Sequence, residues 1–169
     1  MKKISRVLST VLLTMILVIG FSTTVFASSH SVTVHIAKRD TRTTPYTVTA
    51  FTELPGQTIT ITVDSGDTLQ DVVDDALDQQ TNTSGTTFSA GWVDAGTYEY
   101  LDSMTLAGQP YAGSYTIVNW GTNQHKYTGT AWVWNYSGGS DYPSDYMNQT
   151  TIGAHTDLYL YYETSEFIY

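Results

Sequence analysis

The sequence predicts an α+β fold in which several strands accompany a single helix. Segments with alternating apolar and polar residues, the period of half-buried strands, lie on both sides of one segment with helical periodicity. All 4 Trp and all but one of the 13 Tyr follow residue 91. A run of strands, then a helix, then more strands is the element order of α+β proteins.

Strands are expected at three places before the helix. The ranges 31–37 and 46–51 alternate between apolar and polar residues, and the stretch between them is polar and contains Pro45. Residues 58–63 give the clearest pattern, because three β-branched residues at alternate positions share one face of the strand. The segment 28–57 is therefore predicted to supply strands ahead of the helix.

One helix is predicted, over about residues 67–79. Asp67 is the expected N-cap, and Gln70 three residues later completes a capping-box pattern. The apolar residues follow helical spacing and form one face, made of Leu69, Val72, Val73, Ala76 and Leu77. Four aspartates between residues 71 and 78 take the other face and, with Asp67, could gather Ca²⁺, but the calcium-loop motif is absent. A solvated acidic face is expected instead.

The chain after the helix is predicted to be mostly β again. Two loops rich in Gly, Ser, Asn, Asp or Thr are expected at 79–90 and 137–147. The predicted strands cover residues 97–101, 115–120, 130–136 and 157–162.

Residues 1–27 are interpreted as a secretory signal peptide. Three basic residues precede an apolar stretch, and Ala27 supplies the small residue before the expected cleavage point. The apolar stretch is interrupted by Ser9 and Thr10 and is shorter than the ~20 residues that a spanning helix needs, which favours cleavage over a membrane anchor. The mature protein is expected to be secreted and extracellular, without membrane contact.

The mature chain is expected to be acidic and cysteine-free. It has four Lys and Arg against 16 Asp and Glu, a formal charge of −12, which argues against nucleic acid as a partner. The lack of Cys excludes a disulfide scaffold and a thiolate zinc site, and fits export of the Gram-positive style. The His spacing and motifs indicate no catalytic residue, metal or cofactor.

Four segments, in order, resemble the transcobalamin-like C-terminal domain found in many secreted bacterial proteins. Residues 66–73 (GDTLQDVV) are similar to its helix start, and 100–104 (YLDSM) to the strand before its glycine turn. Residues 132–138 (WVWNYSG) are similar to its tryptophan-containing strand and hairpin, and 157–162 (DLYLYY) to its closing strand. The resemblance covers about residues 58–162.

This resemblance implies a β-grasp-like mixed sheet packed on one helix, in a domain at 58–169 that follows the 28–57 segment. In the vertebrate cobalamin carriers this domain covers one face of a bound corrinoid, and a separate helical domain lies below. The mature chain has no length for that helical domain, so cobalamin is implied by analogy only. One fold hosts many activities, so function has to be argued from a site.

Aromatic side chains give the strongest functional signal. Trp132, Trp134 and Tyr136 share one face of a predicted strand, and Tyr159 and Tyr161 share a face of the last strand. The two sets could meet on one sheet surface. Facing water, that surface would be a stacking platform for a ligand; packed on the helix, it would be core. Because the helix offers only Leu, Val and Ala, some exposed aromatic area is expected.

The candidate ligand-binding residues combine this strand with the loop at 137–147. The loop carboxylates could hydrogen-bond a polyhydroxylated ligand or hold a cation, although Gly and Pro there also suit plain turns. The full set is Trp132, Trp134, Asn135, Tyr136, Asp141, Tyr142, Asp145 and Tyr146.

Three functions are left open by the sequence. The first is a non-enzymatic binding module that presents an aromatic surface to an extracellular partner, namely a corrinoid-like small molecule, a glycan or a protein. The second is a structural or self-assembling domain of the cell envelope that associates through strand edges. The third is a small hydrolase that uses carboxylates.

Overall fold

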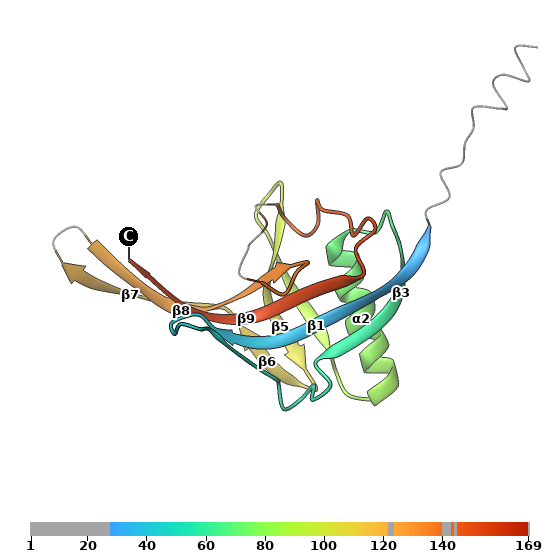
Figure 1. The fold of residues 1–169 in the computed structure, drawn as a ribbon, viewed down its shortest axis with the longest axis horizontal. Coiled ribbons are helices and arrows are strands. Elements are labelled where there is room, and N and C mark those ends of the chain that lie inside the picture. The colour runs from blue at the N-terminus through green and yellow to red at the C-terminus, as the bar shows by residue number, and fades with distance from the viewer. Residues whose placement is uncertain (1–27, 122–123, 140–142, 144, 169) are drawn as a thin grey trace, which may run out of the picture.

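In a computed structural model, described over residues 28–121, 124–139, 143 and 145–168, the chain forms two β-sheets and one α-helix (Figure 1). The architecture is α+β, as predicted. The expected signal peptide, residues 1–27, lies outside the described part of the chain. Within those described ranges, no helix is both long and apolar enough to cross a bilayer.

The elements follow the predicted order, and several strands are longer than predicted. The alternation of apolar and polar residues marks only the half-buried parts of β8 and β9, and both strands continue beyond them. The bounds are β1 (Ser29–Asp40), β2 (Thr47–Thr49), β3 (Thr58–Asp64), α2 (Leu69–Ser84), β4 (Ser89–Asp94), β5 (Glu99–Leu106), β6 (Gln109–Ala112), β7 (Ser114–Gly121), β8 (Gln124–Asn135) and β9 (Asp157–Ile168).

The main sheet is mixed and has β1 and β9 at its centre. Its strand order is β2-β1-β9-β8-β7, and β3 pairs with β1 beside β2. β1 and β9 run parallel, whereas the other neighbours are antiparallel. β1 comes from the 28–57 segment, so that segment is an integral part of the sheet. The sequence does not predict the separate three-stranded sheet, in which β4, β5 and β6 form an antiparallel meander.

The core lies on one face of the main sheet, beneath α2 and the small sheet. Alternate residues of β1, β3 and β9 point to this face and are buried against the apolar side of the helix. The small sheet contributes Leu101, Met104 and Leu106 to the same cluster. The central residues are Val32, Val34, Ile36, Ile59, Ile61, Val63, Leu69, Val72, Val73, Ala76, Leu77, Leu158 and Leu160.

The helix begins at Leu69, and the predicted range of about 67–79 included the expected N-cap, Asp67. The N-cap prediction is wrong by one residue. Thr68 is the N-cap, and its capping box is completed by Asp71. Asp67 instead accepts a hydrogen bond from the backbone N–H of Asp64 at 2.9 Å. At its other end the helix continues to Ser84, where Gly85 adopts a left-handed conformation with φ of +71° and caps it.

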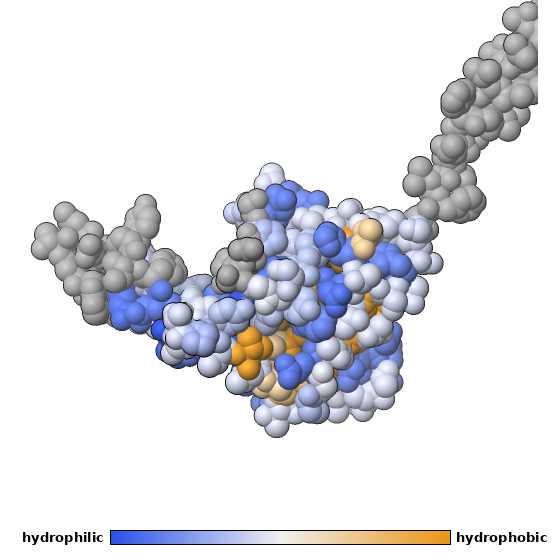
Figure 2. Space-filling view, in the orientation of Figure 1, coloured by the Kyte–Doolittle hydropathy of each residue, from blue (hydrophilic) through white to orange (hydrophobic). Residues whose placement is uncertain are grey.

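Part of the main sheet projects from the body as an arm. β7, the first half of β8 and the last part of β9 extend beyond the two covering layers (Figure 1). Side chains described at the start of β7 are exposed, notably Tyr115 at 52% and Ile117 at 60%. The face of the molecule in Figure 2 is mostly hydrophilic, and its hydrophobic areas are small. The arm therefore leaves β7 as an edge strand with two large apolar side chains in water.

Candidate functional site

A cavity of about 240 Å³ lies where β5, β8 and the segment after β8 meet. Four aromatic residues contribute to its walls, together with two carboxylates and several apolar side chains. The lining residues that the argument uses are Glu99, Tyr100, Trp132, Trp134, Asp145 and Tyr146. The cavity opens at the border between the buried core and the surface.

The β8 wall is set by the pairing of β8 with β9. Trp134 lies opposite Leu160, and Trp132 lies opposite Tyr162, so both tryptophans share the side of the sheet that carries the core. Trp132 is buried at 8% exposure, and its indole N–H donates to the carbonyl of Tyr111 at 2.9 Å. Trp134 lies two residues further along β8, on the same face, and is only partly buried. Trp134 is therefore the indole of this wall that keeps more of its surface open.

The β5 wall places an exposed ring beside an oriented carboxylate. Tyr100 is 42% exposed, and Leu101, next to it, points into the core. Glu99 accepts a hydrogen bond from the side-chain amide of Gln70 at 2.7 Å. Gln70 belongs to the first turn of α2, so the helix holds the Glu99 carboxylate in place at the cavity.

The third wall is the segment that follows β8, and it is tied to the rest of the molecule at both sides. The ring of Tyr146 stacks on that of Tyr98 with centroids 3.8 Å apart. The Gln149 amide donates to the carbonyl of Thr97. On the other side, the carbonyl of Thr150 accepts from the backbone N–H of Leu69 at 2.9 Å. These contacts satisfy a donor at the start of the helix and fix the cavity wall.

A second cavity adjoins the first. It measures about 380 Å³ and shares Tyr100, Leu101 and Trp132 with its neighbour. Asp102 and Tyr115 are among the residues that line it further on, towards the arm. We call the two adjoining cavities together the groove; aromatic and acidic residues line both of them.

The groove carries negative charge and has no basic lining residue within the described ranges. Burial raises the pKa of the Tyr136 hydroxyl, and the nearby Asp145 carboxylate raises it further. All four basic residues of 28–168 lie elsewhere: Lys38 is over the rings of Phe51 and Tyr111, Arg39 pairs with Glu163, Arg42 with Asp40 and Lys126 with Glu166. In the part of the chain that is described, no group of three His, Asp or Glu side chains could hold a metal ion.

Four of the eight predicted site residues line the first cavity, two others are described and do not, and the remaining two lie outside the described residues. Trp132, Trp134, Asp145 and Tyr146 are the four in the wall. Tyr136 is partly buried: its ring stacks on that of His155 with centroids 3.6 Å apart and meets the Trp134 ring edge-on. Asp141 and Tyr142 lie outside the described residues.

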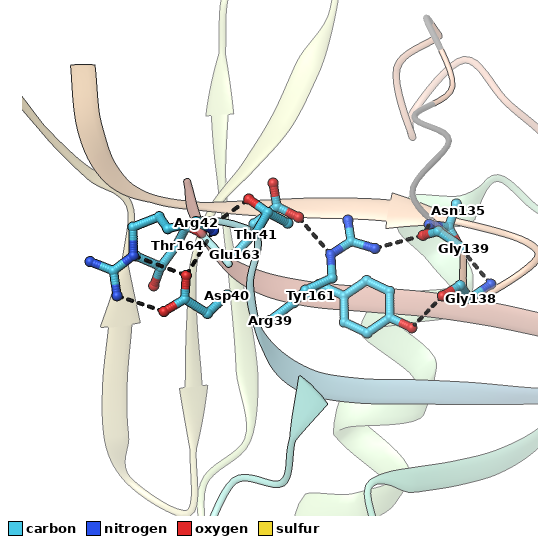
Figure 3. A network of polar contacts seen from close by, with 10 residues as sticks. All are labelled: Arg39, Asp40, Thr41, Arg42, Asn135, Gly138, Gly139, Tyr161, Glu163 and Thr164. Atoms are coloured by element: carbon cyan, nitrogen blue, oxygen red, sulfur yellow. Dashed lines mark hydrogen bonds and ion pairs between the residues drawn. The ribbon is translucent and has the colours of Figure 1, made fainter. Parts of the chain in front are cut away.

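Asn135 lies on the opposite face of β8, in a polar network that closes the hairpin turn (Figure 3). Its side chain is 2% exposed, donates to the carbonyl of Gly139 at 2.8 Å and accepts from the N–H of Gly138 at 2.8 Å. The guanidinium of Arg39 donates to the same Gly139 carbonyl at 2.6 Å and to Glu163. Because these contacts use both ends of its amide, Asn135 is left out of the candidate site.

The two aromatic sets do not meet on one surface, which corrects the expectation. Tyr159 and Tyr161 point to the outer face of the sheet, where Tyr159 stacks on His35 at 4.1 Å and the Arg39 guanidinium lies 4.1 Å from the centre of the Tyr161 ring. The tryptophans of β8 point to the inner face. Register causes the separation, since Trp134 is opposite Leu160 and not opposite a tyrosine.

The sequence prediction missed Glu99 and Tyr100. Both lie in a predicted strand. Tyr98 and Tyr100 share one face of that strand and apolar Leu101 lies on the other, and this pattern is the signal that could have found them.

No protein-family model matches this chain, and neither the curated proteins nor the solved structures give a match to it. The site is therefore argued from its own geometry and charge.

Proposed function

We propose that the protein is an exported, non-enzymatic binding module, and that the groove at Trp134 takes the ligand. The observation that carries this proposal is the cavity of about 240 Å³ lined by rings from two sheets and a tethered segment. Ligand sites are concave and mostly apolar, with a few placed polar groups. Glu99 and Asp145 supply the polar groups here.

The tethered walls favour the groove, and not an open aromatic surface, as the binding site. The Tyr98–Tyr146 stack and the hydrogen bond from Gln70 to Glu99 hold two of the walls before any ligand arrives. A preformed site loses less conformational entropy on binding, which favours affinity. The platform proposed for this chain is therefore a walled groove on the inner side of β8.

The topology supports the finer proposal that the fold is β-grasp-like. A parallel central pair, β1 and β9, is flanked by β3 on one side and β8 on the other, and α2 follows β3 and packs on one face. β1, which supplies half of the central pair, lies outside the residues 58–162 that carry the transcobalamin-like resemblance, so the β-grasp proposal rests on the topology of the whole sheet. Export after cleavage at Ala27 remains part of the proposal, because the basic and apolar pattern of 1–27 is that of a signal peptide.

Binding is tested by titrating the purified protein and two matched variants with a panel of five probes: N-acetylglucosamine, cyanocobalamin, choline, 3,3-dimethyl-1-butanol and Nα-acetyl-lysine amide. Tyr100→Ala removes a cavity ring that is 42% exposed, and the control Tyr46→Ala removes one that is 40% exposed. The proposal predicts that at least one probe binds the unaltered protein and Tyr46→Ala equally, and binds Tyr100→Ala at least about tenfold more weakly. Equal affinity for both variants, or no binding of any probe, contradicts it.

Self-assembly through a strand edge is the second candidate function. It is favoured by β7, an edge strand of the main sheet whose Tyr115 and Ile117 are 52% and 60% exposed. Exposed edge strands are templates for pairing with another chain. Gel filtration over a hundredfold range of concentration tests this: assembly that disappears in Ile117→Lys supports it, and a monomer throughout contradicts it.

A further inference from the structure

We propose that the first cavity binds an organic cation, meaning an ammonium group carried on a short apolar stem. The inference rests on the proposed binding function and names the ligand class of that site. Three observations carry it: the aromatic walls, the carboxylates among them, and the location of every basic side chain of the described chain away from the groove.

The aromatic walls suit a cation because ring faces carry negative charge density. Tyr100, Trp132, Trp134 and Tyr146 all contribute surface to the cavity. A cation near such rings is attracted to their negative faces, and Trp is the best partner. A neutral apolar group would be buried there equally well, so the rings alone do not decide the ligand.

The carboxylates decide the sign of the ligand's charge. Glu99 and Asp145 line the same cavity, and within the described chain neither has a Lys or Arg partner. The contact of Glu99 with the Gln70 amide orients the carboxylate without neutralising it. Asp102 lines the adjoining cavity. A negative ligand in the first cavity would meet two carboxylates, with a third in the adjoining cavity, whereas a cation would supply the charge that the site lacks.

The size of the cavity restricts the cation to a small group. Pockets for drug-sized ligands are about 300–1,000 Å³, and this cavity is about 240 Å³. It accommodates a trimethylammonium head or the end of a lysine side chain, but not a macrocycle. The adjoining cavity of about 380 Å³ leaves room for the rest of a larger ligand.

Calorimetric titration with choline and its neutral isostere 3,3-dimethyl-1-butanol tests the inference. The two compounds differ in the charge of one central atom and have nearly the same shape. We expect choline to bind at least about tenfold more tightly, a difference of about 1.4 kcal/mol. Equal affinity, or tighter binding of the alcohol, overturns the inference.

Two double variants test whether the preference for choline over the alcohol depends on the carboxylates of the cavity. Glu99→Gln with Asp145→Asn keeps the shape and the acceptor for Gln70, and should abolish the preference for choline while binding of the alcohol is unchanged. The control, Asp75→Asn with Asp78→Asn, removes the same charge from the exposed side of α2 and should keep the preference. A preference that survives in the cavity variant, or falls equally in both, overturns the inference.

A third titration separates the two sources of such a cation, and the panel separates this inference from the proposed function. Tighter binding of Nα-acetyl-lysine amide than of choline identifies a lysine side chain of a partner protein; the reverse identifies a free quaternary ammonium compound.

Binding of the alcohol, N-acetylglucosamine or cyanocobalamin without a choline preference overturns the cation inference and leaves the binding function standing. Failure of all five probes overturns both.

Discussion

Trp134 on β8 lies directly opposite Leu160 on β9 in the antiparallel register. Leu160 is fully buried in the core, so this pairing puts Trp134 on the covered side of the main sheet. The indole ring stands where the cover ends and is partly open to the cavity. Because of this register, Trp134 lines a walled groove and does not form part of the open aromatic platform that the sequence predicts.

Trp132 and Trp134 are predicted to separate stability from binding. Trp132→Ala should lower the free energy of unfolding by about 3–5 kcal/mol, because it leaves a void in the core and removes a donor to the Tyr111 carbonyl. Trp134→Ala should cost clearly less, since its ring is only partly buried, and should weaken probe binding. Urea denaturation and calorimetry measure the two effects; a larger loss of stability at Trp134 would refute this division.

The buried ion pair between Arg39 and Glu163 lies on the outer face of the main sheet. Removing one partner should destabilise the fold more than removing both. Arg39→Met leaves the Glu163 carboxylate, 6% exposed, without the guanidinium and should destabilise the fold by about 3–5 kcal/mol. The double variant Arg39→Met with Glu163→Leu should recover most of that loss, because no buried charge remains. Chemical denaturation compares the two variants, and a double variant no more stable than the single one would contradict the argument.

Asp74 should make the protein less stable as pH rises. Its burial raises the pKa above the ordinary 3.8, the hydrogen bond from Trp92 opposes this shift, and Asp78, Asp71 and Asp75 add to it. The folded state therefore binds this proton more tightly than the unfolded state, so the cost is absent below pH 3.8 and develops as pH rises through the folded-state pKa.

Asp74→Asn keeps an acceptor for the Trp92 indole and removes the charge. Its melting temperature should equal that of the unaltered protein near pH 3 and exceed it at pH 7. Thermal melts across this range measure the gap. A variant that is less stable at pH 7 would show that ionised Asp74 stabilises the fold.

Gly129 should be required where β7 pairs with β8 at the base of the arm. A Cβ there would lie 2.7 Å from the Cα of Tyr115 and would also collide with the Ser114 carbonyl oxygen. Gly129→Ala should therefore speed hydrogen exchange of the amides at 114–117 at least about tenfold and leave those of α2 unchanged. Unchanged exchange in β7 would mean that the arm absorbs the added methyl group without separating.

Patterns that depend on one buried face were predictable from the sequence. Alternation located β1 and β3, and helical spacing located the apolar side of α2, because each of these faces meets the core directly. The cap was misplaced because Asp67 with Gln70 and Thr68 with Asp71 both have capping-box spacing. Local sequence does not rank the two, whereas the hydrogen bond from Leu69 to Thr150 favours the later start.

Relationships between distant segments were not predictable in the same way. The tryptophans of β8 alternate as regularly as Tyr159 and Tyr161 of β9, and only the register places these two sets on opposite faces. Glu99 and Trp134 are separated by the whole of β6 and β7, and they meet because the small sheet packs beside β8. A single sequence carries no signal for that packing.

The indole N–H resonances of the uniformly ¹⁵N-labelled protein test the central claim most directly. During titration with choline and the other probes, we predict a saturable shift of the Trp134 resonance. The Trp92 resonance should stay in place, because that indole is hydrogen-bonded to Asp74 on α2 and does not line the cavity. A Trp134 resonance that stays fixed with every probe, or moves only together with that of Trp92, would contradict a binding site at this groove.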